Sequence, residues 1–296
     1  MPSSTAQRTI LHIVNPAAGQ GEAFSKLPKE EALTVYSTRG LYDAQRFAAE
    51  SAMQDPYTHF YVYGGDGTLS EVINGIMQAG ANHTAQISMV AAGTGNDFVR
   101  SLPKGHGSCK VDLIRYGDRY AINVLNTGFD CQVAARISAL KSKPFIAGSF
   151  AYTIGVLQTL VHKLGRKLQI TLTDESDTIH TFSQNNLLCA IGNGKYYGGG
   201  YCALPTADFS DGLLGVVMVE KISRRRFLSL VRHYKAGTHI DIQNRSVTER
   251  FSDIMHFYRC KKIHIEGTDL ICADGEIFSA KSVDLEVVPQ AVQFVW

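Results

Sequence analysis

A glycine-rich segment, Gly64 to Gly75 (GGDGTLSEVING), has the residue types and spacing of a phosphate-binding loop. It follows an apolar run and opens an amphipathic stretch, which is the strand–loop–helix context that such a loop needs. Gly64, Gly65 and Gly67 permit unusual backbone angles and a close approach of phosphate oxygens. Free N–H groups and the dipole at a helix start favour an anion. The segment predicts an anion site, and the alternative is a tight turn with an ordinary helix cap.

Two side chains in this loop carry further predictions. Thr68, followed three residues later by Glu71, is typical of a capping box, which would fix the start of the helix at the loop. Asp66 places a carboxylate beside the expected phosphates, where it is repulsive unless it meets Mg²⁺ or a sugar hydroxyl. The loop is not a Walker A loop, because no Gly-Lys-Ser/Thr follows.

Two further glycine-rich loops follow apolar runs of the same kind. They are Gly93 to Asp97 (GTGND) and Asn15 to Gly21 (NPAAGQG). Because loops at the carboxyl ends of neighbouring parallel strands meet at one sheet edge, GGDGT and GTGND together predict one ligand site. Asn96 or Asp97 could equally be only the N-cap of a short helix. The Asn15 loop by itself is typical of a turn.

Acidic side chains lie beside glycines in the second half of the chain. Asp274 and Glu276 flank a glycine in the sequence ADGE, and Asp-Gly is the common dipeptide of two-residue hairpins. A hairpin turn is therefore the favoured interpretation of this segment from its pattern alone. Asp208 and Asp211 occupy another turn-like segment, DFSDGL, with a spacing that could hold a hard cation.

The first third of the chain alternates strand-like runs, glycine loops and helical segments. Continuous apolar runs such as Thr9 to Val14 are typical of strands buried on both faces. Strands that alternate with helices form right-handed crossovers and a parallel, Rossmann-like sheet. The predicted strands span residues 9–14, 33–37, 59–63 and 87–92, and the predicted helices span residues 43–53, 69–77 and 98–102.

From about Tyr120 strand-like pieces dominate, with turn signals such as Asp174 to Asp177 between several of them. The sequence therefore predicts an α/β domain over residues 1–122 and a β-rich domain over 123–287. A tail over about 288–296 could pack back on the first domain. The later predicted strands span 121–125, 168–172, 178–182, 187–191, 213–219, 263–266 and 283–288, with helices near 132–140 and 224–235.

Composition narrows the class of protein. The hydrophobic fraction of 45% and charged fraction of 19% are those of a folded globular protein. A net charge of +2 and a pI of about 8.2 are too mild to argue for a nucleic-acid partner. The six cysteines form no CxxC pair or Cys/His cluster, so we expect reduced thiols rather than a zinc site or a disulfide framework.

Two segments bear on membrane contact. Phe145 to Leu164 approaches the length of a membrane span, but glycine and polar residues interrupt it, which favours a packed helix or one lining an apolar cleft. Arg224 to Val231 is a short basic amphipathic stretch that suits anionic headgroups, although an ordinary surface helix has the same pattern. The N-terminus lacks a secretory pattern. We therefore expect a cytoplasmic protein in transient, peripheral membrane contact.

The motifs, in their order along the chain, resemble the diacylglycerol kinase catalytic-domain family, specifically its soluble bacterial lipid kinases. The resemblance rests on the segments NPAAGQG, GGDGTLSEVINGI, GTGNDFVRSL, NTGFD, GNGKYYGGGY and ADGE, and covers essentially the whole chain. Sphingosine and ceramide kinases are relatives, and NAD kinases are more distant ones. The resemblance implies a Rossmann-like three-layer α/β/α domain and a β-sandwich domain, with the active site in the cleft between them.

The resemblance also implies roles for particular residues. Asp274 would accept the proton of the substrate hydroxyl, and Glu276 would sit near the Mg²⁺ of the nucleotide, with Asp66 as a third catalytic carboxylate. Asp208, Asp211 and the carbonyl of Leu213 would form a second, structural Mg²⁺ site. The residues expected to contact ATP are Thr38, Gly64, Gly65, Asp66, Gly67, Thr68, Leu69, Ser70 and Thr94, to which the glycine loops add Asn15, Asn96 and Asp97.

The function implied is an ATP- and Mg²⁺-dependent kinase that acts on diacylglycerol or a similar lipid at the membrane surface. NAD kinase-like chemistry is an alternative, disfavoured by GTGNDF and the basic stretch. A lipid- or nucleotide-binding regulatory protein with little turnover is another, disfavoured by the intact Asp66, Asp274 and Glu276. An exposed sheet edge could pair two copies into a homodimer. The sequence does not identify the acceptor lipid.

Overall fold

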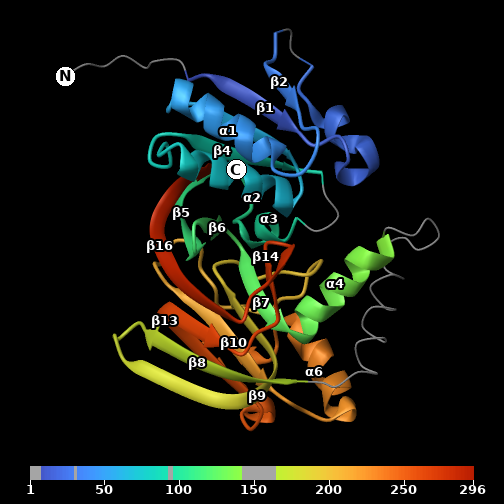
Figure 1. Cartoon of the computed structure of the whole chain (residues 1–296), viewed down its shortest axis with the longest axis vertical. Helices are drawn as coiled ribbons and strands as arrows, with labels where there is room; N and C mark the ends of the chain where they lie inside the picture. Colours follow the sequence, from blue (N-terminus) through green and yellow to red (C-terminus); the bar gives the residue numbers. More distant parts are fainter. Residues whose placement is uncertain (1–7, 30–31, 93–95, 142–164) are drawn as a thin grey trace. The chain divides into compact units, whose positions relative to one another are not determined.

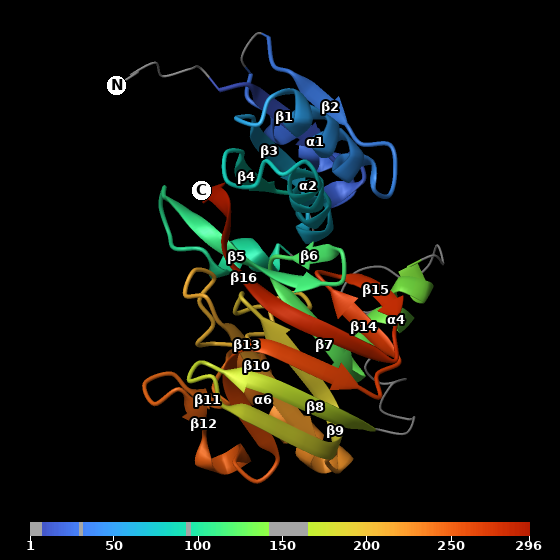
Figure 2. The ribbon, with the colours of Figure 1, turned by 60° about the vertical axis from the view of Figure 1, so that its left-hand side comes forward.

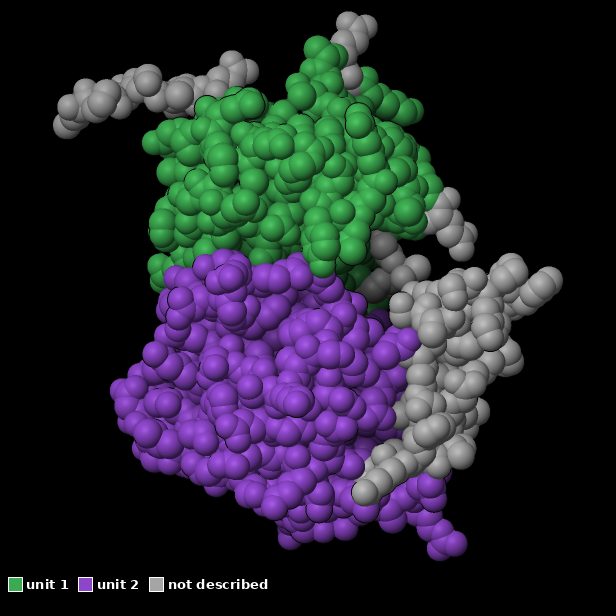
Figure 3. Space-filling view, in the orientation of Figure 1, with its two compact units in different colours: residues 1–112, 290–296 green, residues 113–289 purple. Residues whose placement is uncertain are grey.

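The computed structural model describes residues 8–29, 32–92, 96–141 and 165–296. The chain divides into two compact units, which Figure 3 distinguishes by colour. Unit 1 contains residues 1–112 together with 290–296, and unit 2 contains residues 113–289. The domain boundary predicted at 122/123 thus lies further along the chain than the division between the units. The apolar stretch Phe145 to Leu164 lies outside the described residues.

Unit 1 is built on a parallel sheet in the order β2–β1–β3–β4 (Figure 1). The C-terminal end of β16 adds a further parallel strand beside β4, with Gln293 opposite Gln86. The strand bounds are β1 Ile10–Val14, β2 Val35–Ser37, β3 His59–Gly64, β4 Gln86–Ala91 and β16 Ser282–Val295. All four predicted strands of this region are present.

The helices of unit 1 follow the apolar periodicity of the sequence. α2 (Asp66–Gln78) buries its apolar face completely, through Leu69, Val72, Ile73 and Ile76. It packs closely on α1 (Asp43–Gln54), because a Cβ on Gly75 would lie only 2.3 Å from the carbonyl oxygen of Gln45. The 3₁₀ helix η1 (Ala18–Lys26) packs on Val14, Tyr63 and Ala92. The short helix α3 spans Asp97–Ser101.

Unit 2 is a β-sandwich whose two sheets share long strands. One sheet runs β15–β14–β7–β9–β10–β13, and the other pairs β9, β8, β13, β16, β5 and β6. Figure 2 shows β8, β9 and β13 side by side. The remaining strands are β5 Ser108–Tyr116, β6 Arg119–Ala121, β7 Val124–Gly128, β8 Arg166–Asp174, β9 Ile179–Gly192, β10 Leu214–Glu220, β13 Met255–Glu266, β14 Leu270–Ala273 and β15 Glu276–Ser279, with a separate pair β11 Ile240–Asp241 and β12 Ser246–Val247.

Alternation along the strands divides the apolar residues of unit 2 between two cores. On β10, Val216 and Met218 enter the core between the sheets, whereas Val217 and Val219 enter a second core with α6 (Arg224–Ala236). Phe129, at the start of α4 (Phe129–Lys141), also contacts this second core. A short 3₁₀ helix, η2 (Glu249–Phe251), supplies a further buried side chain, that of Phe251.

The structure differs from the predicted elements of unit 2 in two informative places. The strand predicted over 121–125 is interrupted between β6 and β7, and the two strands predicted over 178–191 form the single strand β9. The strands β5, β14 and β15 were not predicted, because β14 and β15 have only four residues each and charged residues interrupt the apolar ones in β5. Among the described residues, no helix has the length and apolar character needed to cross a membrane.

Candidate functional site

The loop that contains Gly64 connects β3 to α2 in unit 1. α2 begins at Asp66, and its N-cap Gly65 is extended (φ −106°, ψ −174°) with no side-chain capping hydrogen bond. The first N–H groups of a helix have no intrahelical acceptor, and the dipole adds partial positive charge there. This end of α2 therefore has the geometry of an anion site.

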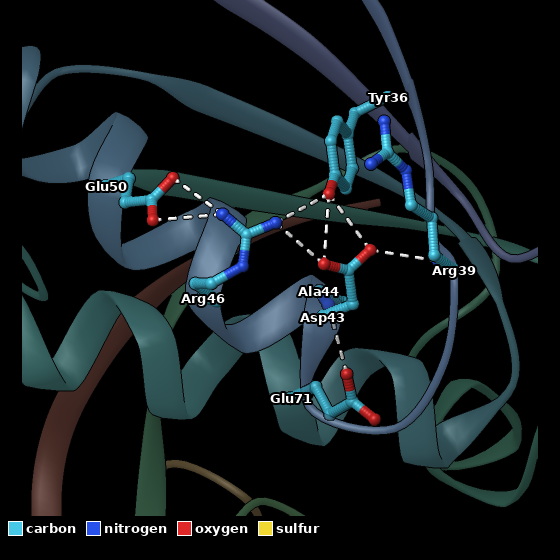
Figure 4. Close-up of polar contacts among 7 residues, drawn as sticks. All are labelled: Tyr36, Arg39, Asp43, Ala44, Arg46, Glu50 and Glu71. Carbon is cyan, nitrogen blue, oxygen red and sulfur yellow. Dashed lines mark hydrogen bonds and ion pairs between the residues drawn. The ribbon is translucent and has the colours of Figure 1, made fainter.

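The capping box predicted for this helix is wrong. The Oγ1 of Thr68 accepts a hydrogen bond from the Nδ2 of Asn15 at 3.0 Å, which ties the first glycine loop to the second. The Oε2 of Glu71 accepts from the N–H of Ala44 at 3.1 Å, in the first turn of α1 (Figure 4). Thr68 lies inside the helix rather than at its N-cap, and the N-cap Gly65 has no side chain that could cap the start of α2.

The glycines of the loop do not adopt the unusual backbone angles that the sequence suggested, but they do keep space at the helix start. Gly64, Gly65 and Gly67 all have ordinary backbone angles, since none has a positive φ. A Cβ on Gly64 would lie 2.6 Å from the Oγ1 of Thr68, so this position needs glycine for space. A Cβ on Gly67 would meet no atom within 4 Å. The backbone at Gly67 is thus open to a ligand that approaches the helix start.

Asp66 joins the two glycine-rich loops that follow β3 and β4. Its carboxylate accepts hydrogen bonds from the N–H of Asp97 at 2.9 Å and of Phe98 at 3.4 Å, at the start of α3. Burial raises the pKa of the Asp66 carboxyl, and the nearby Asp97 carboxylate adds to that shift. Asn96, the N-cap of α3, is in the left-handed conformation (φ 51°), and Asp97 pairs with Arg100 at 2.9 Å. The predicted convergence of the loops is therefore present.

Other residues expected to contact ATP have structural partners in unit 1. The N–H of Thr38 donates to the carbonyl of Val14 at 2.9 Å, and its side chain is buried. The next turn is held by Asp43, which accepts from the N–H of Arg39 at 2.9 Å (Figure 4). The same figure shows the hydroxyl of Tyr36 and the guanidinium of Arg46 on the Asp43 carboxylate. This network fixes the loop after β2.

Three more residues expected to contact ATP are Leu69, Ser70 and Thr94. Leu69 is fully buried, and its N–H donates to the carbonyl of Gly65 at 3.2 Å within the helix. Ser70 is also buried, and its carbonyl accepts from Asn74 at 2.8 Å. Both residues thus have buried side chains, and the backbone groups named here bond within the helix. Thr94 lies outside the described residues.

In unit 2, Asp274 lies in the hairpin turn between β14 and β15. Asp274 and Gly275 both have positive φ (47° and 89°), as a type I′ two-residue turn requires. The hairpin interpretation of ADGE is therefore confirmed. The Asp274 side chain turns inward and is only 8% exposed. Its carboxylate accepts three backbone hydrogen bonds, from the N–H groups of Ile122 (2.7 Å), Asn123 (3.1 Å) and Val124 (3.0 Å).

These bonds explain the interruption between β6 and β7, since the amides there donate to a carboxylate instead of a neighbouring strand. Asn123 extends the connection. Its Nδ2 donates to the carbonyl of Tyr196 at 2.9 Å, and its own carbonyl accepts from the N–H of Asn193 at 2.9 Å. Glu276, beyond the turn, forms an ion pair with Arg119 at 2.6 Å. The Asp274 carboxylate is thus fixed in position by β6, β7 and the loop after β9.

The segment expected to bind a second Mg²⁺ has a different set of partners. The Oδ1 of Asp208 accepts from the N–H of Ser210 at 3.0 Å, and the Oδ1 of Asp211 accepts from the N–H of Leu213 at 3.0 Å. The Oδ2 of Asp211 pairs with the guanidinium of Arg259 at 2.6 Å. A fixed positive charge thus occupies the carboxylate that the cation would need, and these residues do not fit Mg²⁺.

Sequence reasoning missed a half-buried polar network at the start of α4. The hydroxyl of Tyr197 donates to the Oδ2 of Asp130, and Tyr234 lies 3.2 Å from the Tyr197 hydroxyl. Burial raises the pKa of the Asp130 carboxyl to about 6, although hydrogen bonds from Tyr197 and Asn126 oppose that shift. The available signal was an acid directly after Gly-Phe in NTGFD. Its burial depends on α6 and the loop after β9, which no local pattern reveals.

The chain matches two known protein families, one over each half. Residues 9–126 match the family described as the diacylglycerol kinase catalytic domain. Residues 123–296 match the family described as the YegS C-terminal NAD kinase beta sandwich-like domain. The chain therefore belongs to the diacylglycerol kinase catalytic-domain family, with a β-sandwich of the YegS type.

Individual relatives cover most of the chain. A probable lipid kinase YegS-like from Shewanella frigidimarina is 29% identical, over 86% of this chain and 81% of its own length. A diacylglycerol kinase from Staphylococcus aureus is 33% identical, over 71% of this chain and 70% of its own. A diacylglycerol kinase from Mycobacterium tuberculosis is 26% identical, over 96% of this chain and 94% of its own.

The fold is also found among solved structures. A putative diacylglycerol kinase from Bacillus anthracis superposes with a TM-score of 0.71 at 20% identity, over 99% of this chain and 98% of its own. At that level of identity the likeness concerns the fold, an α/β domain followed by a β-sandwich, as the sequence motifs predicted.

Proposed function

We propose that this protein is an ATP- and Mg²⁺-dependent lipid kinase, which transfers the γ-phosphoryl group of ATP to the hydroxyl of diacylglycerol or a similar lipid. The observation that carries the proposal is the uncapped start of α2, with Asp66 tying its loop to the loop after β4. A triphosphate suits that site, because oriented N–H groups and a helix dipole bind phosphate without a lysine. The family of the chain and the names of its relatives support a lipid as the acceptor.

On this proposal the residues of unit 1 bind and orient the nucleotide. The open backbone at Gly67 receives phosphate oxygens, and Thr38, Thr94 and Asn96 add polar contacts from the neighbouring loops. Asp66 supplies carboxylate oxygens, which are the donors that Mg²⁺ prefers, whereas Glu276 of unit 2 is paired with Arg119. When bound, Mg²⁺ would neutralise part of the triphosphate charge. Phosphoryl transfer depends mainly on such positioning and electrostatic stabilisation.

Asp274 is the proposed proton acceptor for the lipid hydroxyl. An alcohol is hardly ionised at neutral pH, so its proton must leave as the new P–O bond forms. The three backbone bonds to Asp274 support this role, because they fix the carboxylate in one orientation. The role requires the lipid hydroxyl to reach Asp274 and the γ-phosphate at the same time.

Membrane contact is proposed for the exposed side of α6. The apolar residues Phe227, Leu230 and Tyr234 are buried in unit 2, so the helix packs as an ordinary surface helix on that side. Arg224, Arg225 and the 60% exposed Leu228 face solvent. A basic face with an exposed leucine would suit a transient contact of a cytoplasmic enzyme with anionic headgroups.

One experiment tests the proposed activity. The pure protein is incubated with γ-labelled ATP and Mg²⁺, in parallel with diacylglycerol vesicles, a total bacterial lipid extract, and NAD. We expect label in phosphatidic acid or in another extracted lipid, and none when Mg²⁺ is chelated. Labelled NADP without any labelled lipid would support the NAD kinase-like alternative instead. Binding of ATP without label in any arm would favour a regulatory protein.

A further inference from the structure

One cationic side chain in unit 2 connects two loops that each carry carboxylates. Arg259 on β13 donates from Nη2 to the Oδ2 of Asp211 at 2.6 Å, and from Nη1 to the Oε2 of Glu175 at 3.0 Å. The Arg259 side chain is 15% exposed, Asp211 is 26% exposed and Glu175 is 53% exposed, so the pair with Asp211 is the better shielded from solvent. One guanidinium thus joins the loop before β10 to the turn between β8 and β9.

The register of the sheet explains why Arg259 reaches both loops. Arg259 lies opposite Gly215 of β10, a few residues after Asp211. The next residue, Cys260, lies opposite Asp174 of β8, directly before Glu175. β13 is therefore the strand that separates the two loops, and a long side chain at 259 can contact both.

One oxygen of each carboxylate in the first loop accepts hydrogen bonds from the loop itself. The Oδ1 of Asp208 accepts from both the N–H (3.0 Å) and the hydroxyl (2.9 Å) of Ser210. The Oδ1 of Asp211 accepts from the N–H of Leu213 at 3.0 Å. Mg²⁺ demands near-octahedral oxygen ligands at about 2.0–2.1 Å, and here it would also lie beside a fixed positive charge.

We propose that the guanidinium of Arg259 takes the structural role that the sequence motifs assign to a second Mg²⁺, so that unit 2 is stable without a divalent cation. A planar guanidinium offers several N–H donors in a fixed fork, so it can hold two carboxylates at once as a metal ion would. Like a metal ion, the guanidinium is a cation, and it neutralises part of the negative charge of the Asp211 and Glu175 carboxylates. This inference concerns folding and does not rest on the proposed kinase activity.

The test is thermal unfolding without nucleotide, in EDTA and in millimolar Mg²⁺. We expect the wild-type Tm to be the same in both. Arg259→Gln keeps a side chain of similar shape but loses the charge, so its Tm in EDTA should fall by about 2–4 °C or more. Mg²⁺ should recover part of this loss, because Asp211 is then available to a cation. The control is Lys261→Gln, which removes an exposed pair with Asp177 on the same strand and whose Tm should change little.

Two results would overturn the inference. One is a wild-type Tm that rises in Mg²⁺ by an amount that Asp211→Asn abolishes, since a cation would then bind despite Arg259. The other is an Arg259→Gln variant as stable as the wild type in EDTA, since the contacts of the guanidinium with Asp211 and Glu175 would then contribute nothing to stability. If Arg259→Gln fails to fold, the wild-type and Asp211→Asn comparison decides alone. The lipid-labelling assay has a separate readout, so either proposal can fail without the other.

Discussion

At the residue scale, Asp274 combines a turn position with a buried carboxylate, and this combination gives a sharp test of its role. Asp274→Asn should abolish phosphoryl transfer, because an amide cannot take up the hydroxyl proton. It should also lower the free energy of unfolding by about 1–3 kcal/mol, because one amide group would face the N–H donors of residues 122–124. ATP binding, measured by titration, should remain.

Asp177→Asn is the matched control for that variant. Asp177 also has a positive φ (63°) in a hairpin turn of unit 2, but it is exposed and pairs with Lys261 at 2.8 Å. We expect its transfer rate to equal that of the wild type. Turnover retained by Asp274→Asn would remove Asp274 from its proposed role.

Asp130 predicts a pH dependence of stability. Its pKa is raised by burial to about 6, whereas an aspartate in the unfolded chain titrates near 4. The folded state therefore binds more protons between these values, and the free energy of unfolding falls as the pH rises from about 4 to about 6. By the usual conversion this loss is at most about 2–3 kcal/mol.

Asp130→Asn should remove that dependence, so its stability relative to the wild type should be better at pH 8 than at pH 5, as measured by urea unfolding. Asp241→Asn serves as a control, because hydrogen bonds from Asn244 lower the pKa of the exposed Asp241 carboxyl. Asp241 is ionised at both pH values, so its relative stability should not change between them. An equal effect of Asp130→Asn at the two pH values would contradict the buried carboxylate.

At the element scale, the loop from β3 to α2 predicts opposite consequences for two neighbouring glycines. Gly64→Ala places a Cβ about where Thr68 lies, 2.6 Å from its Oγ1, so we expect a loss of about 1–3 kcal/mol in unfolding free energy. Gly67→Ala has open space in the first turn of α2, and alanine favours a helix by up to about 1 kcal/mol. It should therefore fold normally but bind ATP weakly, because its methyl group occupies the phosphate approach.

Urea unfolding and ATP titration of both variants separate these effects. Normal ATP affinity of a stably folded Gly67→Ala variant would argue against phosphate binding at the start of α2. The prediction depends on the start of α2 having no side-chain cap, because its N-cap residue is Gly65 and the side chains of Thr68 and Glu71 bond to residues of other segments.

At the scale of the whole molecule, the chain leaves unit 1 and returns to it only at its last residues. Phe294 of β16 is fully buried in unit 1, where its ring meets Phe98 edge-on at 5.2 Å. The carbonyl of Trp296 accepts from the N–H of Gly107 at 2.8 Å. Residues 290–296 thus complete the sheet of the α/β unit, although they follow the whole of unit 2 in the sequence.

Phe294→Ala should therefore lower the stability of unit 1 by about 3–5 kcal/mol, the usual cost of a phenylalanine cavity. The loss should appear in thermal unfolding and as weaker ATP binding, although Phe294 is far in sequence from every glycine loop. Phe24→Ala, the same change at a 44% exposed position of unit 1, is the control and should cost much less. An intact unit 1 in a chain that ends at Pro289 would contradict this account.

Local sequence patterns predicted those helices, strands and turns whose conformation is determined by residues close together in the sequence. The apolar face of α2 and the buried runs of β1 and β3 follow from a repeat that can be counted along the chain. The turn at Asp274 and Gly275 follows from its dipeptide. The division of β6 from β7 could not be predicted, because its cause is a carboxylate about 150 residues away in the sequence.

The candidate site shows the same division. The sequence by itself determined that glycine loops follow two parallel strands, and that carboxylates lie at 66, 274 and 276. Only the tertiary structure decided which partners those carboxylates have: Asp66 binds the N–H of Asp97, Glu276 pairs with Arg119, and Glu71 caps α1 instead of α2.

The acidic loop at Asp208 and Asp211 was open to a cation from its spacing, and the register of β13 gave Asp211 a guanidinium instead. The physical reason is common to these cases. Spacing along a chain fixes which side chains share a turn or a face, but the charge that meets a carboxylate comes from whichever strand packs beside it.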